Sequence, residues 1–217
     1  RSLATSPAQK AGLVIPTAGG KTRIALRVGL HVLADSPEDD TIVIWVTHRK
    51  RLRRQAHRAL QRLIKAGTEV PEGASELFSR IHFEMIHDLP TVLARFGDKA
   101  VLVIVDEAHH AAAPSYEPLF EDDPAHRGLF LTATPNRLDG LPIGIDEIAF
   151  TVTYRELFER GCVVEPQFDE PLILEGLDWS TPDGLHDLAD YILGRTDGDL
   201  NKVLVTVSRV DRVETLH

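Results

Sequence analysis

The sequence has very little cysteine, since Cys162 is the only thiol in 217 residues. A single thiol excludes an internal disulfide and a zinc site built from cysteines, and it is typical of a reducing compartment. The chain also lacks an apolar run long enough to span a bilayer, and it lacks a signal peptide. Its ten histidines show no spacing typical of a metal site. We therefore expect a cytoplasmic globular protein with no membrane segment.

Acidic residues are absent between Asp40 and Glu69, although the whole chain carries a net charge of −9. That interval contains only basic charges: Arg49, Lys50, Arg51, Arg53, Arg54, Arg58, Arg62 and Lys65. Apolar residues recur there at helical spacing: Leu52, Ala56, Ala59, Leu60, Leu63 and Ile64. The pattern predicts an amphipathic helix with a cationic outer face. Such a face is either simply solvated or attracts an anionic partner, and the absence of interleaved aromatic residues argues against a base-stacking platform.

Short β-branched runs alternate with helical patterns along most of the chain. The runs are Leu13–Ile15, Ile42–Val46, Ile81–Met85, Val101–Val105, Leu129–Thr132 and Ile148–Val152. The expected helices are Thr22–Ala34, Lys50–Ala66 and Leu89–Phe96, with shorter ones near Tyr116 and Tyr154. Several runs are unbroken, which is typical of parallel strands covered on both faces. The sequence predicts an α/β fold with a mainly parallel sheet, whose loops meet at the carboxyl edge.

The amino-acid composition of the chain changes near Pro166. We expect residues 1–165 to form one domain. Residues 166–200 are rich in Pro, Gly and acidic residues and contain one helical stretch, so we expect a linker or short excursion. Residues 201–217 begin with an apolar run followed by a helical pattern, and we expect them to be the truncated start of a second domain.

A glycine-containing loop follows the first apolar run and precedes the first helix. It comprises Thr17, Ala18, Gly19, Gly20, Lys21 and Thr22. Small residues let backbone N–H groups approach phosphate oxygens, Lys21 supplies a cation for the β- and γ-phosphates, and the Thr22 hydroxyl can hold magnesium. The match to the eight-residue phosphate-loop template is imperfect, because Ile15 stands where the first glycine belongs. The alternative is a turn that only caps the following helix.

Two carboxylates follow the apolar run Val101–Val105 directly. Asp106 and Glu107 would therefore lie at the same sheet edge as the glycine-containing loop. A magnesium–triphosphate site needs such a pair: Asp106 would hold magnesium through its water shell, and Glu107 would orient and deprotonate the attacking water. The alternative is a solvated strand end.

The start of the basic helix offers a different site. Thr47, His48 and Arg49 follow the run Ile42–Val46, where a hydroxyl, backbone N–H groups and a cation could hold the phosphates of one nucleic-acid strand. Such contacts position a strand without reading its sequence.

Four segments occur in the order PTAGGKT, VTHRKRLRRQ, VIVDEAHH and LTATPNRLDG, all between residues 13 and 140. Together they resemble the first RecA-like domain of a superfamily 2 DEAD/DEAH-type helicase, a P-loop NTPase. The strings DEAHHAAAPSY and LTATPNRLDG are similar to the branch that holds the excision-repair helicases and the restriction-enzyme motor subunits.

The resemblance implies roles for particular residues. Lys21, Asp106 and Glu107 would be catalytic, with Thr22 and Asp106 on magnesium. His109, Thr132, Ala133 and Thr134 would couple hydrolysis to nucleic-acid movement. Short hydroxyls at a strand end could switch partners when the γ-phosphate leaves, although two threonines could equally just close a strand.

The resemblance also implies cofactors and partners. ATP and magnesium would be the cofactors. The nucleic-acid partner would be DNA or RNA, with DNA favoured, and it would be contacted through its backbone. A second RecA-like domain of the same longer chain would be another partner. Nuclease, methylase or repair proteins would be further partners. The function expected is that of an ATP-hydrolysing helicase or translocase motor. The alternative is a nucleotide-dependent switch or scaffold in a defence or repair complex.

Three departures from the family pattern affect these expectations. Ala18 replaces a common glycine, and a positive φ there would cost about 1–2 kcal/mol. The adenine-contacting segment is absent or reduced to Arg1–Lys10, which leaves adenine selectivity open. The arginine fingers that the second domain supplies in this family, worth roughly 10³–10⁵ in rate in related enzymes, are missing, so the chain alone should bind nucleotide but hydrolyse it poorly. DNA versus RNA, polarity, and unwinding versus translocation stay open.

Overall fold

The computed structural model describes residues 9–36, 41–97, 99–110, 126–134 and 144–164, together with six isolated positions between 181 and 190. The chain divides into two compact units, residues 1–165 and 166–217. All helices and strands with defined bounds belong to the first unit. Among the described residues, no helix is both long and apolar enough to cross a membrane.

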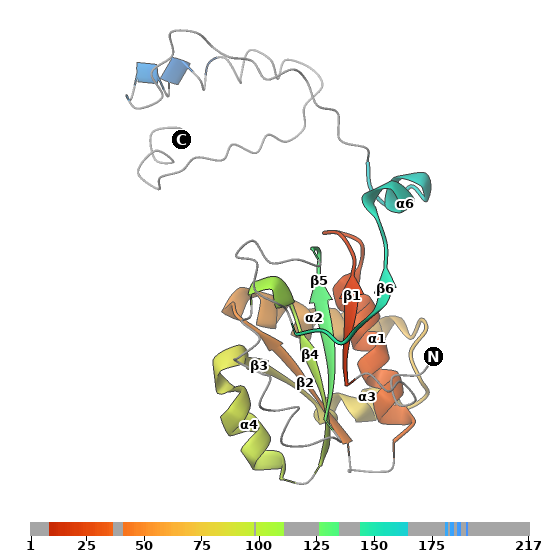
Figure 1. Ribbon diagram of the computed structural model, residues 1–217. Coiled ribbons are helices and arrows are strands. Elements are labelled where there is room, and N and C mark those ends of the chain that lie inside the picture. Colours follow the sequence, from red (N-terminus) through yellow and green to blue (C-terminus); the bar gives the residue numbers. More distant parts are fainter. Residues whose placement is uncertain are drawn as a thin grey trace. The chain divides into compact units, whose positions relative to one another are not determined.

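A six-stranded sheet forms the centre of the first unit (Figure 1). Its strands are β1 Lys10–Val14, β2 Thr41–Thr47, β3 Ile81–Met85, β4 Ala100–Val105, β5 Arg127–Thr132 and β6 Glu147–Thr151. They lie in the order β3-β2-β4-β5-β1-β6, and every neighbouring pair is parallel. The predicted α/β class is therefore confirmed, with a sheet that is parallel throughout its described strands.

Helices cover both faces of this sheet. They are α1 Lys21–Ala34, α2 Lys50–Ala66, α3 Ala74–Leu77 and α4 Leu89–Phe96. A further short helix, α6 Tyr154–Glu159, follows β6. The chain moves in one direction across the sheet from β1 to β2 to β3, and right-handed crossovers place α1, α2 and α3 on one face. It then reverses from β3 to β4, so α4 lies on the opposite face.

The strand side chains alternate between the two faces. On β2, Val43 and Trp45 pack toward α1, α2 and α3, whereas Ile42, Ile44 and Val46 pack toward α4. Both sets are buried. This two-sided burial explains why the strand runs in the sequence are continuously apolar rather than alternating.

Some element boundaries differ from the sequence-based expectation. β1 begins at Lys10 rather than Leu13, because Lys10, Ala11 and Gly12 pair with β5, and the last two also pair with β6. Single-sequence patterns carry no information about such two-sided pairing. The one-turn helix α3 was not predicted, while the short helix expected near Tyr154 is confirmed as α6. The helix expected near Tyr116 lies outside the described residues, as do most of residues 166–200 and all of 201–217.

Reciprocal hydrogen bonds begin α6. The Glu156 backbone N–H donates to Thr153 Oγ1 over 3.2 Å, and the Thr153 backbone N–H donates to Glu156 Oε2 over 2.6 Å. This capping box satisfies two of the N–H groups that a helix start leaves open. The local sequence therefore determines where α6 begins.

Two isoleucines of the same sheet test the packing account. Ile44 is fully buried in β2, whereas Ile148 on β6 is 52% exposed. We expect Ile44→Ala to lower the free energy of unfolding by about 2–5 kcal/mol, because it leaves a cavity between two layers. Ile148→Ala should lower it by less than about 1 kcal/mol. Urea denaturation of both variants checks this, and similar losses at the two positions would contradict it.

Candidate functional site

The glycine-containing loop joins the end of β1 to the start of α1. Its entry is held by the Ile15 backbone N–H, which donates to the Thr132 carbonyl over 3.0 Å, and by the Gly19 N–H, which donates to the Pro16 carbonyl over 3.1 Å. No side chain caps α1, and its first turn contains no acidic residue. The positive end of the helix dipole and its first N–H groups are thus available to an anion.

Three small residues of this loop lie in different structural environments. Gly20 has φ 87°, and a Cβ there would meet nothing within 4 Å, so the backbone is bare on that side. Gly19 is packed instead: a Cβ would lie 2.5 Å from Ile15 Cγ2. Ala18 adopts φ 68°. The sequence-based concern about Ala18 is confirmed, since an alanine in this left-handed conformation costs about 1–2 kcal/mol.

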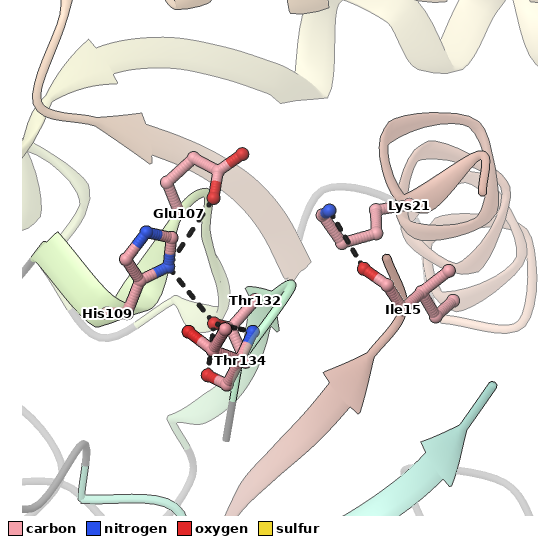
Figure 2. Close-up of polar contacts among 6 residues, drawn as sticks. All are labelled: Ile15, Lys21, Glu107, His109, Thr132 and Thr134. Carbon is pink, nitrogen blue, oxygen red and sulfur yellow. Dashed lines mark hydrogen bonds and ion pairs between the residues drawn. The ribbon is translucent and has the colours of Figure 1, made fainter. Parts of the chain in front are cut away.

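Lys21 begins α1 and is buried, with 8% of its surface exposed. Its Nζ donates a hydrogen bond to the Ile15 carbonyl over 2.9 Å (Figure 2). This bond holds the ammonium group beneath the loop rather than in solvent. A buried cation that is bonded to a neutral acceptor keeps its charge available for an anion.

The acidic pair lies at the same cavity as the loop. A cavity of about 260 Å³ is lined by Gly20, Lys21 and Thr22 from the loop and by Asp106 and Glu107 from the end of β4. Thr17 and Ala18 also line it. The structure therefore brings together two segments that are more than 80 positions apart in the sequence, with a cation and two carboxylates facing one space.

Burial is the main cause that raises the pKa of Asp106, to about 6 from an ordinary value of 3.8. The neighbouring Glu107 carboxylate raises it further, while Lys21 and the Glu107 backbone N–H oppose the rise. The Asp106 backbone is fixed by its N–H, which donates to the Val46 carbonyl of β2 over 3.0 Å. A partly desolvated carboxylate held in this way is well suited to a divalent cation, which would restore the favourable interactions that burial removes.

Glu107 belongs to a polar chain that links the ends of β4 and β5 (Figure 2). Glu107 Oε2 lies 3.5 Å from His109 Nδ1, and the same nitrogen lies 3.1 Å from Thr132 Oγ1. The Thr132 hydroxyl donates to the Thr134 carbonyl over 2.6 Å and accepts from the Thr134 N–H over 3.1 Å. Because the single hydroxyl proton is committed to Thr134, His109 Nδ1 must be the donor to Thr132. Ala133 is half-buried between the two threonines.

The sharp turn after β4 makes these contacts possible. Glu107 has φ 52°, in the left-handed region. Its carbonyl accepts from the His110 N–H over 2.9 Å, which starts a 3₁₀ turn over Ala108–His110. The turn folds His109 back toward Glu107. A strained non-glycine residue of this kind is most often found at functional sites.

Thr47 is the last residue of β2, and His48 and Arg49 follow it beside this turn. The His48 ring lies 4.7 Å from the His110 ring, which lies 4.2 Å from the His109 ring. Burial, followed by the proximity of His110 and Arg49, lowers the pKa of His48. His48 is therefore neutral at pH 7, and Arg49, which is exposed, is the cation of this trio. The Thr47 side chain is buried, and its Oγ1 lies 3.5 Å from the Arg49 backbone N–H.

Five residues that line the cavity were not among the predicted site residues: Pro16, which begins the loop, and Arg23, Leu52, Gln55 and Ala56. Leu52 and Ala56 look like ordinary members of the apolar stripe of α2, and Gln55 looks like part of its polar face. Only the packing of α2 against α1 places them at the cavity. No signal in the sequence gives the direction in which these two helices cross.

The cavity fits a magnesium-bound nucleoside triphosphate by the chemistry of its lining. Bare backbone at Gly20 and an uncapped helix start suit phosphate oxygens, as does the Lys21 ammonium. Thr22 and Asp106 supply the hydroxyl and carboxylate oxygens that magnesium prefers, and magnesium takes few protein ligands when phosphates complete its shell.

The chain resembles known proteins in sequence. Residues 3–137 match the family described as "Type III restriction enzyme, res subunit". A stretch of 73 residues is 40% identical to the "Putative helicase 22" of a Sulfolobus islandicus filamentous virus, and it covers 32% of this chain and 13% of the viral protein.

Two solved structures share the fold at low sequence identity. The helicase domain of Hef from Pyrococcus furiosus has a TM-score of 0.52 and 20% identity, over 99% of this chain and 50% of that one. A nuclease-deletion mutant of the Type ISP restriction-modification enzyme LlaGI, in complex with a DNA substrate mimic, has a TM-score of 0.50 and 12% identity, over 89% of this chain and 21% of that one. The chain thus spans half or less of each protein that it resembles.

The raised pKa of Asp106 predicts a pH dependence of stability. The folded state holds this proton up to about pH 6, whereas the unfolded state releases it near pH 3.8. Folding therefore binds a proton between these values, and stability falls as the pH rises through this window. Asp106→Asn should abolish the fall and stabilise the protein at pH 7 by on the order of 2–3 kcal/mol. Urea denaturation at pH 4 and pH 7 with a chelator present measures this, and parallel pH profiles for wild type and variant would contradict it.

Proposed function

Because the chain belongs to the family described as "Type III restriction enzyme, res subunit" and is a superfamily 2 helicase-type RecA-like domain, we propose that it is the ATP-binding motor domain of an ATP-dependent helicase or translocase. The observation that carries the proposal is the single cavity shared by the phosphate loop and the Asp106–Glu107 pair. The chain covers only part of its relatives, so movement along nucleic acid is proposed for a longer protein that contains a second RecA-like domain.

The loop residues bind and orient the triphosphate. Backbone N–H groups around Gly19 and Gly20 donate to phosphate oxygens, and Lys21 Nζ exchanges its bond to the Ile15 carbonyl for the β- and γ-phosphates. Thr22 and Asp106 would hold magnesium, which would neutralise charge on the phosphates when bound. The cost of desolvating Asp106 is then offset by the cation.

Glu107 is the proposed general base. Its carboxylate accepts the proton of the water that attacks the γ-phosphate, and His109 Nδ1 lies 3.5 Å from that carboxylate. The same His109 nitrogen lies near Thr132 Oγ1. Any change in the position of Glu107 during hydrolysis therefore reaches the end of β5 through one imidazole ring, which is the proposed role of His109, Thr132, Ala133 and Thr134 in coupling.

The nucleic acid is proposed to lie at the ends of β2 and β4. Arg49 is the exposed cation there, and the His48–His110–His109 rings connect this position to Glu107. DNA is favoured over RNA, since one protein of similar fold was solved with a DNA mimic. A cytoplasmic location and partnership with nuclease, methylase or repair proteins belong to the same proposal. So do the domain limits 1–165, 166–200 and 201–217, of which the first coincides with a compact unit.

A second candidate function is a nucleotide-dependent switch or scaffold in a defence or repair complex. It uses the same phosphate loop and does not require movement along a nucleic acid. The ring contacts between His48 and His110 favour the motor, because a switch without nucleic acid has no use for a connection between Glu107 and the Thr47–Arg49 segment.

Lys21→Ala tests nucleotide binding by the 217-residue chain. A hydrogen bond to a charged group is worth about 1.5–3 kcal/mol, so affinity for ATP should fall by at least roughly 10- to 100-fold. Titration with a fluorescent ATP analogue measures the affinity, and circular dichroism checks the fold. Lys65→Ala, at the exposed far end of α2, is the control and should bind as wild type does. Unchanged affinity in Lys21→Ala would contradict the proposal.

Glu107→Gln tests hydrolysis in the longer protein with its second domain. Loss of the general base should lower kcat by roughly 10²–10⁴. ATP affinity should be retained, because binding rests on the loop. Wild-type turnover should rise many-fold on adding DNA or RNA, measured by phosphate release. Turnover that responds to a protein partner and ignores both nucleic acids would favour the switch over the motor.

A further inference from the structure

The outer side of α2 carries a straight row of basic side chains. We refer to this row as the cationic ridge; its members are Arg51, Arg54, Arg58, Arg62 and Lys65. They follow one another at intervals of three or four residues, so they lie along one side of the helix. At a rise of 1.5 Å per residue, the ridge is about 21 Å long.

The ridge is exposed and forms no ion pair with the described part of the chain. All five side chains are exposed, while the opposite side of α2 is buried through Ala56, Leu60 and Leu63. Among the residues that the structure describes, no carboxylate forms an ion pair with any member of the ridge. A groove lined by Arg51, Arg54, Gln55, Arg58 and Arg62 runs along it.

Such a row costs helix stability. Like charges three or four residues apart destabilise a helix by about 0.2–0.5 kcal/mol per pair. A solvated helix face normally mixes both signs and gains the same amount from each opposite pair. A face that only needed solubility would therefore not be uniformly basic in a chain whose net charge is −9.

We propose that the cationic ridge is a second nucleic-acid-binding surface that holds the phosphate backbone of one strand independently of its sequence. The inference rests on the proposed function and adds a site to the Thr47–Arg49 segment. One strand presents a phosphate about every 3.4 Å of helix axis, so the ridge spans about six of them. Guanidinium groups bind phosphate in a bidentate manner, which suits a row made almost wholly of arginine.

The composition of the groove favours nucleic acid over an acidic protein. Among the described residues its lining is arginine and one glutamine, with no aromatic or apolar side chain. Protein interfaces need a desolvated apolar or aromatic centre, whereas backbone binding to nucleic acid needs only charge and hydrogen-bond donors.

The ridge begins beside the nucleotide cavity. Gln55 lines both the ridge groove and the cavity that contains Lys21 and Asp106. A strand held on the ridge would therefore lie one side chain away from the nucleotide cavity. This placement gives the motor a second contact with its track on the same element that lines the ATP site.

The test compares Arg58→Gln/Arg62→Gln with Arg155→Gln/Arg160→Gln in the 217-residue chain. Each double variant removes two exposed charges. The first removes them from the ridge, and the second removes them from α6 and its C-cap. Binding of a 20-nucleotide oligo(dT) and of a 20-base-pair duplex is measured by fluorescence anisotropy across a salt series. In the ridge variant the slope of log K against log salt should shrink by about 1.4 for the single strand and about 1.8 for the duplex. Affinity at low salt should fall on the order of tenfold or more.

Two further measurements sharpen the outcome. Arg58→Lys/Arg62→Lys keeps the charge and should keep the wild-type slope, and the α6 control should match wild type. If the ridge variant kept the wild-type slope and affinity, the ridge would not be a nucleic-acid-binding surface. The proposed site at Thr47–Arg49 would be unaffected by that result. Equal displacement of DNA by polyglutamate at matched charge would also overturn it, in favour of an acidic protein. Failure of the wild-type chain to bind ATP would instead contradict the proposed function. The two outcomes are distinguishable because the DNA-binding assay of the ridge contains no nucleotide.

Discussion

The parallel pairing of β1, β5, β4 and β2 is the constraint on which the rest of this structure depends. Parallel neighbours end at the same edge of the sheet, so four loops meet there although they are spread over more than a hundred residues. The Ile15 N–H bonded to Thr132, and the Asp106 N–H bonded to Val46, extend this pairing one residue beyond the strands. The loops are thus fixed at their first residues, and the site inherits the rigidity of the sheet.

Several unfavourable features of the domain lie at this edge. Ala18 and Glu107 have positive φ, and Asp106 is a buried carboxylate whose pKa is raised by its surroundings. Each lowers stability in the free protein. The buried apolar layers on both faces of the sheet supply the stability that tolerates them. Strain and desolvation placed against a well-packed core are what a site needs if a highly charged ligand is to relieve them on binding.

Basic side chains are arranged around the same site. Lys21 lies under the phosphate loop, Arg49 is exposed just after β2, and Gln55, which lines the same cavity, also lines the groove along the ridge of α2. The imidazole rings of His48, His110 and His109 lie between the end of β2 and Glu107. A net acidic chain therefore presents one group of its basic side chains together on α2 and the loops around the site. This arrangement would steer a polyanion to the side of the domain where hydrolysis is proposed.

The sequence by itself determined the fold class, the order of the elements and the identity of the chemical groups. Strands buried on both faces must be apolar, phosphate loops must be small and basic, and carboxylates after a strand mark a sheet edge, so these leave local traces. Only the tertiary structure decided what depends on distant pairing: the extension of β1 to Lys10, the contact of His48 with His110, and the entry of Gln55 and Arg23 into the cavity. Such contacts depend on how helices cross and strands register, and no short stretch of residues encodes either.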